Sequence, residues 1–226
     1  MRLGMAINLT RCVGCQTCEA VCKLENGVPK DFYFSRTIDH EVGEYPDVER
    51  ELFPVICMHC ENASCIDVCP LDAIERTEEG IVQIDADKCR GCESCIDACP
   101  YGAMNFFEGD VEYYEVGGGE SPIKERIREE HSKEGIATKC DFCIERVREG
   151  MENGLTPGED QEATPFCVIA CPTEGRTFGD LDDPESEVSK TIKQKDGFQL
   201  QPYEGADPSV FYISQRSKEP KDGGNG

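Results

Sequence analysis

The chain has 226 residues and a formal net charge of -23, from 46 acidic and 23 basic residues. This charge argues against nucleic acid and anionic lipid as partners, because both require clustered Lys and Arg. Sixteen residues are cysteine and none is tryptophan, so ordinary apolar core material is scarce and we expect metal ligation to hold the fold together.

The start of the sequence and its hydropathy bear on the compartment. We see no secretory signal ahead of the cysteines, which disfavours a disulfide-stapled secreted scaffold. No apolar run reaches the ~18 residues of a membrane helix, so we expect any membrane link to go through a partner. The acidic excess suits a salt-adapted, soluble surface or steering toward a basic partner, and we favour the former.

In chain order, short apolar segments alternate with groups of cysteines. Strands are predicted over Leu3–Leu9 and Ile81–Ile84, and Ala103–Phe107 is a third apolar segment with strand character. The cysteines form four groups of four: Cys12, Cys15, Cys18 and Cys22 (group I); Cys57, Cys60, Cys65 and Cys69 (group II); Cys89, Cys92, Cys95 and Cys99 (group III); and Cys140, Cys143, Cys167 and Cys171 (group IV).

The segment between groups III and IV has a different composition. Asp110–Glu120 is acidic and ends in three glycines, which predicts a flexible linker. Ser121 and Pro122 suit the N-cap and first turn of a charged helix that Gly135 can close.

The cysteines end before the tail. Residues Gly179–Ile213 contain loop residues and one amphipathic stretch, Val188–Ile192. Such a tail cannot form its own core, so we expect it to strap over the cysteine-bearing body. Ser217–Gly226 is predicted to fray.

The spacing of the cysteines indicates iron-sulfur clusters. Groups I and III share the pattern C-x2-C-x2-C-x3-C and align in the residues around it, so the chain contains an internal repeat. In this ferredoxin pattern three cysteines wrap one cubane, and the fourth reaches a second cluster. Proline follows the last cysteine in groups II, III and IV, whereas Lys23 follows Cys22.

Structural zinc is the main alternative, because all-cysteine sites also bind zinc. Zinc sites typically join two separated pairs, whereas three cysteines within seven residues suit one face of a cubane. We therefore favour iron-sulfur clusters over a zinc-stabilised interaction scaffold.

The order of the groups predicts how they pair. Groups II and III lie close together, as in a compact two-cluster ferredoxin, while groups I and IV bracket them. We predict an α+β fold of two nested dicluster ferredoxin-like modules, with long irregular loops and a C-terminal strap, carrying four 4Fe-4S clusters. Residues 1–48 and 109–185 would supply the halves of module A, the latter with the acidic linker, residues 49–108 would form module B, and residues 186–226 the tail.

Several short motifs resemble one known family, the four-cluster electron-transfer subunits of membrane-associated molybdopterin oxidoreductases. These motifs are residues 1–5, 57–60, 99–103, 139–143, 178–184 and 210–213. The family serves arsenate, polysulfide, thiosulfate, tetrathionate and dimethyl sulfoxide reductases, and the start and tail look most like the arsenate type. The resemblance implies a non-catalytic subunit that relays electrons between quinol, or a membrane quinol-oxidising partner, and a molybdopterin catalytic subunit.

The resemblance also implies four ligand sets. They are Cys12, Cys15, Cys18 and Cys171 nearest the catalytic subunit; Cys140, Cys143, Cys167 and Cys22; Cys57, Cys60, Cys65 and Cys99; and Cys89, Cys92, Cys95 and Cys69 toward the quinol side. All sixteen cysteines are present, so we expect no three-iron cluster. It further implies co-export with a signal-bearing partner to the outer face of the cytoplasmic membrane, with cytoplasmic assembly as the alternative. A conduit serving a hydrogenase or another soluble redox enzyme is the alternative function.

Four residues beside the cysteines attract attention. Arg11, Lys88 and Lys139 each precede the first cysteine of a group, where a cation would raise a cluster's reduction potential, unless it simply lies on the surface. His59 lies between two cysteines, and with four thiols at hand we expect it to support the site rather than ligate. No nucleophile–base pair, carboxylate dyad or phosphate loop stands out, so we expect no substrate of its own.

Overall fold

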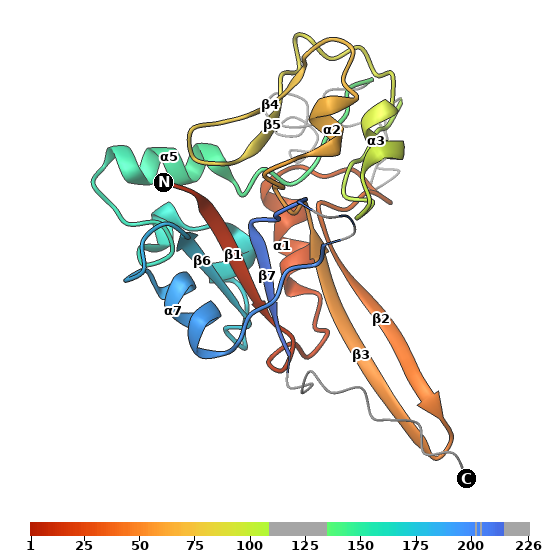
Figure 1. The fold of residues 1–226 in the computed structure, drawn as a ribbon, viewed down its shortest axis with the longest axis vertical. Helices are drawn as coiled ribbons and strands as arrows, with labels where there is room; N and C mark the ends of the chain where they lie inside the picture. The colour runs from red at the N-terminus through yellow and green to blue at the C-terminus, as the bar shows by residue number, and fades with distance from the viewer. Residues whose placement is uncertain (109–134, 202, 204, 215–226) are drawn as a thin grey trace, which may run out of the picture.

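A computed structural model of the chain describes residues 1–108, 135–201, 203 and 205–214 (Figure 1). Its central element is strand β1 (Leu3–Asn8), which agrees with the strand predicted over Leu3–Leu9. β1 lies between β6 (Arg176–Asp180), which is antiparallel to it, and β7 (Val210–Ile213), which is parallel to it. The N-terminal and C-terminal parts of the chain therefore meet in one sheet.

Both faces of β1 are buried, because successive strand residues point to opposite sides. Leu3, Met5 and Ile7 belong to the main core, whereas Ala6 packs with residues of helix α7 (Glu187–Gln194). Gly4 has no room for a side chain, because a Cβ there would lie 2.4 Å from Leu181 Cδ1. Small residues on this side of β1 leave room for Leu181 at Gly4 and for α7 at Ala6.

Short helices lie beside this sheet. α1 (Thr17–Glu25) packs against α6 (Phe166–Ile169). α5 (Ile144–Glu152) packs against a single 3-10 turn, η1 (Gln161–Ala163). Helices α1 and α6 thus come from opposite halves of the chain and carry cysteines of groups I and IV.

The middle of the chain forms a second, smaller unit, at the top of Figure 1. β4 (Ile74–Arg76) and β5 (Val82–Ile84) form a two-stranded antiparallel sheet, and β5 agrees with the strand predicted over Ile81–Ile84. Next to it α2 (Ser64–Asp67) packs against α3 (Ser94–Ala98). These two helices carry cysteines of groups II and III, so the unit repeats the helix pairing seen for α1 and α6.

A long hairpin projects from the body (Figure 1). Its strands β2 (Ser35–Glu44) and β3 (Asp47–Ile56) pair in register from Ser35↔Ile56 to Glu44↔Asp47. The module boundary that we placed at residue 48 lies inside β3.

The tail contacts both the central sheet and the smaller unit. The amphipathic stretch at 188–192 is helical, within α7. Beyond it the chain reaches the smaller unit, where Ser209 N donates to Met58 O (2.8 Å) and Glu61 N donates to Asp207 O (2.9 Å). The tail then returns to the central sheet as β7, which we had not predicted.

Three other predictions concern a strand, the segments outside the described residues and membrane helices. Ala103–Phe107 is not a strand: Asn105 and Thr138 exchange a single pair of backbone hydrogen bonds, an isolated bridge. The acidic linker at 110–120, the charged helix opening at 121–122 and the frayed end at 217–226 lie outside the described residues. Within the residues described, no helix is both long and apolar enough to cross a membrane.

Candidate functional site

The fold brings cysteines that are distant in sequence into four sets, and all sixteen are free thiols. Three of the sets each line one cavity. The thiols of the remaining set influence one another's pKa values. The sets are Cys12, Cys15, Cys18 and Cys171 (site 1); Cys22, Cys140, Cys143 and Cys167 (site 2); Cys57, Cys60, Cys65 and Cys99 (site 3); and Cys69, Cys89, Cys92 and Cys95 (site 4).

Each group begins with the same backbone turn. The residue before its second cysteine has a positive φ in every group: Gly14 (67°), His59 (45°), Gly91 (65°) and Phe142 (61°). Glycine adopts this left-handed conformation without strain, but His and Phe do so at a cost. The two costly residues are fully buried and lie against each other, with ring centroids 4.0 Å apart. Packing between groups II and IV therefore holds both turns.

The last cysteine of each group accepts a hydrogen bond from the residue four positions later. In groups II, III and IV the donor is a backbone N–H, from Ala73 (3.3 Å), Ala103 (3.4 Å) and Gly175 (3.2 Å). Cys22 lacks the following proline and continues within α1, and there the side-chain amide of Asn26 donates instead (3.5 Å). All four groups thus place an N–H donor on the sulfur that crosses to the neighbouring site.

Burial raises the pKa of eight of the sixteen thiols. It raises the pKa of Cys60 to about 11 and those of Cys65 and Cys143 to about 12, and neighbouring thiols add to each shift. The exposed thiols Cys15 and Cys92 have lowered pKa values, because residues two positions later donate hydrogen bonds to them. The raised pKa values of Cys60, Cys65 and Cys143 favour the protonated thiol, and a metal that binds there displaces the proton.

The donor set suits a polynuclear cluster. Each site offers four sulfurs, and a cubane needs four thiolates that stand apart, one for each iron corner. Within the described residues no three Cys, His, Asp or Glu side chains are grouped closely enough to share a single ion. N–H donors on sulfur, which these sites provide, are a feature by which proteins adjust iron-sulfur clusters.

Comparisons with known proteins agree with this geometry. Models of 4Fe-4S dicluster domains match residues 48–113 and 81–149, and a 4Fe-4S binding domain matches residues 9–28. A protein of Halobacterium salinarum named as the iron-sulfur subunit of a dimethyl sulfoxide reductase is 39% identical over 93% of this chain and 78% of its own length. The arsenate respiratory reductase iron-sulfur subunit of a Shewanella species is 36% identical over 94% and 96%, and a subunit of the sulfite dehydrogenase of Allochromatium vinosum is 34% identical over 95% and 84%.

The chain belongs to the family of iron-sulfur subunits of molybdopterin oxidoreductases. These relatives are electron-transfer subunits and not catalytic ones, which confirms the resemblance seen in the sequence motifs and the non-catalytic role. The matching domains also confirm that the cofactors are 4Fe-4S clusters, more than one, and decide against the zinc scaffold.

One basic residue of this iron-sulfur subunit was missed in the sequence. Arg176 is 6% exposed, lines the site 1 cavity and donates to Ser35 Oγ (3.0 Å), a residue that lines the site 2 cavity. Burial opposes its charge, but the neighbouring thiols Cys167 and Cys18 raise the pKa of the guanidinium. A cation among neutral thiols is costly, whereas beside thiolate-bound clusters of net negative charge it is compensated. The sequence does not distinguish it from a surface residue, because Arg176 is the first residue of β6 and has Glu174 and Asp180 close by in the chain.

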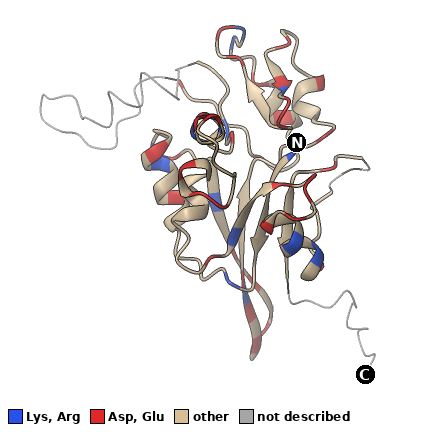
Figure 2. Cartoon of the chain, turned by 90° about the vertical axis from the view of Figure 1, so that its left-hand side faces the viewer, with Lys and Arg blue, Asp and Glu red and all other residues tan. Residues whose placement is uncertain are grey.

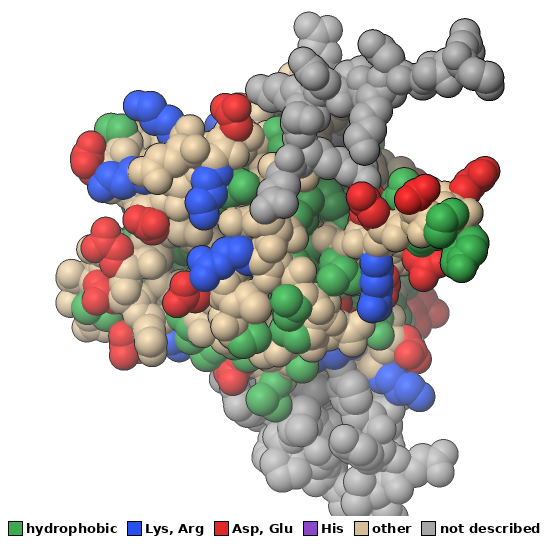
Figure 3. Space-filling view, turned by 90° about the horizontal axis from the view of Figure 1, so that it is seen from below, with side chains coloured by type: hydrophobic (Ala, Val, Ile, Leu, Met, Phe, Trp, Pro, Cys, Tyr) green, Lys and Arg blue, Asp and Glu red, His purple; other side chains and the backbone are tan. Residues whose placement is uncertain are grey.

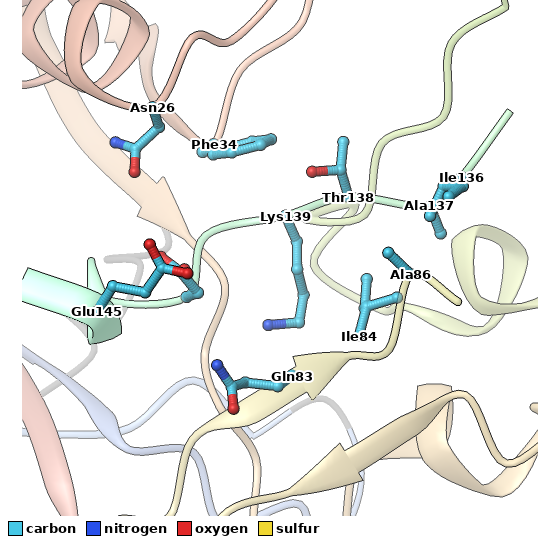
Figure 4. A pocket seen from close by; sticks show the side chains of 11 residues that line it. Asn26, Phe34, Gln83, Ile84, Ala86, Ile136, Ala137, Thr138, Lys139 and Glu145 are labelled. Carbon is cyan, nitrogen blue, oxygen red and sulfur yellow. The ribbon is translucent and has the colours of Figure 1, made fainter. Parts of the chain in front are cut away.

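Lys139 is a second buried basic residue close to the cysteines. It is 6% exposed and lines a cavity of about 200 Å³ between Asn26 and Phe34 on one side and β5 on the other (Figure 4). Its Nζ donates to Val82 O and to Cys140 O (2.9 Å). Burial raises the pKa of the Cys65 thiol in site 3, and the Lys139 charge opposes that shift. Lys139 therefore lies between sites 2 and 3.

The other two basic residues that we singled out lie at the surface. Arg11 pairs with Glu174 (3.1 Å) and Lys88 with Asp85 (3.1 Å), and both are exposed. No ion pair in the described part of the chain involves Arg176 or Lys139. The charges of buried Arg176 and Lys139 can therefore act on a cluster at close range. Those of Arg11 and Lys88 are neutralised by their partners and screened by solvent.

His59 is fully buried beside site 3. Its Nδ1 accepts a hydrogen bond from Val82 N (3.1 Å), so Nε2 carries the proton. Burial, and then the charges of Lys139 and Arg76, lower the pKa of His59 well below its usual value, so the ring is neutral. It supports the left-handed turn of group II through Phe142.

Proposed function

We propose that this subunit carries four 4Fe-4S clusters, one in each of the four sites, and relays electrons to or from a molybdopterin catalytic subunit. The ligand sets are those of sites 1 to 4. Each set contains three cysteines of one group and the last cysteine of another, as the spacing requires. Sites 1 and 2 would form module A, and sites 3 and 4, between them in sequence, the nested module B. The clusters supply one-electron transfer, and the protein supplies their placement and surroundings.

The order of the sites supports a relay with two ends. Cys15 in site 1 and Cys92 in site 4 are exposed, whereas sites 2 and 3 contain only buried or half-buried thiols. Arg176 lies between sites 1 and 2, and Lys139 between sites 2 and 3. Sites 3 and 4 exchange Cys99 and Cys69 between groups II and III. This order, 1–2–3–4 with exposed thiols only at its ends, is the observation that carries the proposal.

We further propose that site 1 faces the catalytic subunit and site 4 faces quinol or a membrane quinol-oxidising partner. Support comes from the family, whose named members belong to arsenate and dimethyl sulfoxide reductases. By the same resemblance we propose co-export with a signal-bearing partner to the outer face of the cytoplasmic membrane. A conduit for a hydrogenase is the second candidate, because the geometry of a relay does not depend on the enzyme that it serves.

The test is anaerobic purification of the tagged chain from its native host. We expect a large molybdenum-containing subunit to co-purify, with about sixteen iron atoms on this chain, four for each cubane. The oxidised, undamaged protein should give no stoichiometric three-iron EPR signal. Iron without molybdenum, or a hydrogenase as the companion, would leave the relay but contradict the assignment of its partner.

A further inference from the structure

The hairpin of β2 and β3 stands away from the rest of the molecule (Figures 1 and 2). In the described part of the chain its two strands form hydrogen-bonded sheet only with each other. We call residues 38–50 the outer hairpin. Every residue of the outer hairpin is exposed except Val42, which is half-buried. A two-stranded hairpin without a packed face is marginally stable in water, so this arm gains little by standing alone.

The outer hairpin also exposes apolar side chains. Tyr45, at its tip, is 92% exposed, more than any other large hydrophobic residue described, and Ile38 and Val48 are exposed along the strands. Hydrophobic and acidic side chains gather at the end of the arm at the right of Figure 3. An aromatic ring held clear of the surface is a typical anchor of protein interfaces, where it fills a pocket of the partner.

The charges of the arm select the kind of partner. The outer hairpin has five carboxylates and one cationic residue, Arg50, which pairs with Asp39 on one face. On the other face Glu44 and Asp47 lie directly opposite each other, and a like-charged cross-strand pair is destabilising. A basic surface would relieve that repulsion. Anionic lipid would be repelled, and so would a second copy of a chain with a net charge of -23.

The base of the hairpin lies beside site 1. Thr37 and Pro54 line the site 1 cavity, and the side chain of Leu52 lies against Gly14, within group I. Val13 in the same loop is 63% exposed, next to the exposed Cys15. A protein bound along the hairpin therefore also covers the surface through which site 1 meets its neighbour.

We propose that the outer hairpin is the docking arm for the redox protein that exchanges electrons at site 1, with Tyr45 in an apolar pocket that has a basic rim. The proposal rests on the proposed function, because it names the surface by which site 1 finds its partner, the molybdopterin catalytic subunit. The hairpin then fixes the distance between site 1 and the partner's redox centre.

The test uses the complex purified anaerobically from native cells, with molybdenum and the large subunit measured per tagged chain. The variants are Tyr45→Ala and the double change Glu44→Lys with Asp47→Lys. Leu24→Ala, an exposed apolar residue in α1, and Glu162→Lys, an exposed carboxylate in η1, are the matched controls. Iron content and the EPR spectrum of reduced clusters show whether each variant is folded and loaded.

We expect the hairpin variants to hold the large subunit at least roughly tenfold more weakly, with unchanged iron and EPR signals, while the controls hold it normally. If both hairpin variants retain the large subunit normally, the docking arm is overturned and the proposed function stands. If the wild-type chain brings a different redox enzyme that the hairpin variants lose, the arm stands and the molybdopterin assignment fails. If the loaded wild-type chain brings no redox partner, both proposals fail.

Discussion

Replacing Arg176 tests whether a buried cation sets the potentials of two clusters. We expect Arg176→Met, which keeps much of the side-chain volume and removes the charge, to lower the reduction potentials at sites 1 and 2. Arg176 is 6% exposed and its guanidinium lies among thiols of both sites, so little solvent screens its charge. Reduction adds a negative charge to a cluster, and a nearby cation stabilises that added charge.

The size of the effect follows from Coulomb's law. At an effective dielectric constant of about 20 and a separation of about 8 Å, two unit charges interact by roughly 2 kcal/mol. For one electron, where ~59 mV corresponds to a tenfold change, this is roughly 90 mV. Water and small shifts of structure will offset part of it, so we expect a drop of about 50–90 mV at sites 1 and 2.

The assay is an EPR-monitored redox titration of the anaerobic protein, in which the clusters of sites 3 and 4 serve as internal references. Arg176→Lys keeps the charge and should restore most of the potential even if its hydrogen bond to Ser35 is lost. A purely structural role would lower the thermal stability of Arg176→Met without a selective shift. Unchanged potentials, or equal shifts at all four sites, would refute the electrostatic reasoning.

Three further predictions concern neighbouring residues. Asn26→Leu removes the side-chain amide that donates to the crossing cysteine Cys22, so the cluster of site 2 alone should become harder to reduce in the same titration. A shift at another site would contradict this. Lys139→Met should lower the reduction potentials at sites 2 and 3 by tens of millivolts, because Lys139 is buried. Lys88 is exposed and ion-paired, so Lys88→Met should change no cluster potential measurably. Equal effects of the two substitutions would contradict this distinction between buried and exposed lysines. Arg148 donates two hydrogen bonds to Glu79 and holds the pKa of that carboxyl at about 2. Above pH ~4.5 the free energy of unfolding of the wild type should therefore exceed that of Arg148→Met by about 1 kcal/mol in thermal unfolding, and the difference should shrink toward pH 2. A difference that did not vary with pH would exclude the ion pair as its source.

The chemistry of the sites was predictable because it depends on the spacing of cysteines that are close together in the sequence. Each group folds its own loop, and the glycines at positions 14 and 91 mark the left-handed turn of groups I and III. In groups II and IV the same turn uses His59 and Phe142, which no local rule would select. Only their mutual packing across the fold explains them.

The parts that escaped prediction depend on contacts between distant residues. β7 pairs with β1 from the opposite end of the chain, and its four residues are too short for a periodic signal. Arg176 acquires its role only when β6 places it between two sites. The β2–β3 hairpin did carry a signal, the Tyr45–Pro46 turn between alternating strands. Both faces of the outer hairpin are charged and exposed, so the pattern did not indicate a core.

The most direct test of the account is native mass spectrometry of the anaerobically isolated subunit, combined with single Cys→Ser changes. We expect the intact chain to carry four Fe4S4 units, and Cys171→Ser, which takes the crossing ligand from site 1, to alter that cluster while the EPR signals of sites 3 and 4 stay unchanged. Fewer than four units in the undamaged chain, or loss of a site 3 or 4 signal in that variant, would contradict the proposed cluster count and ligand sets.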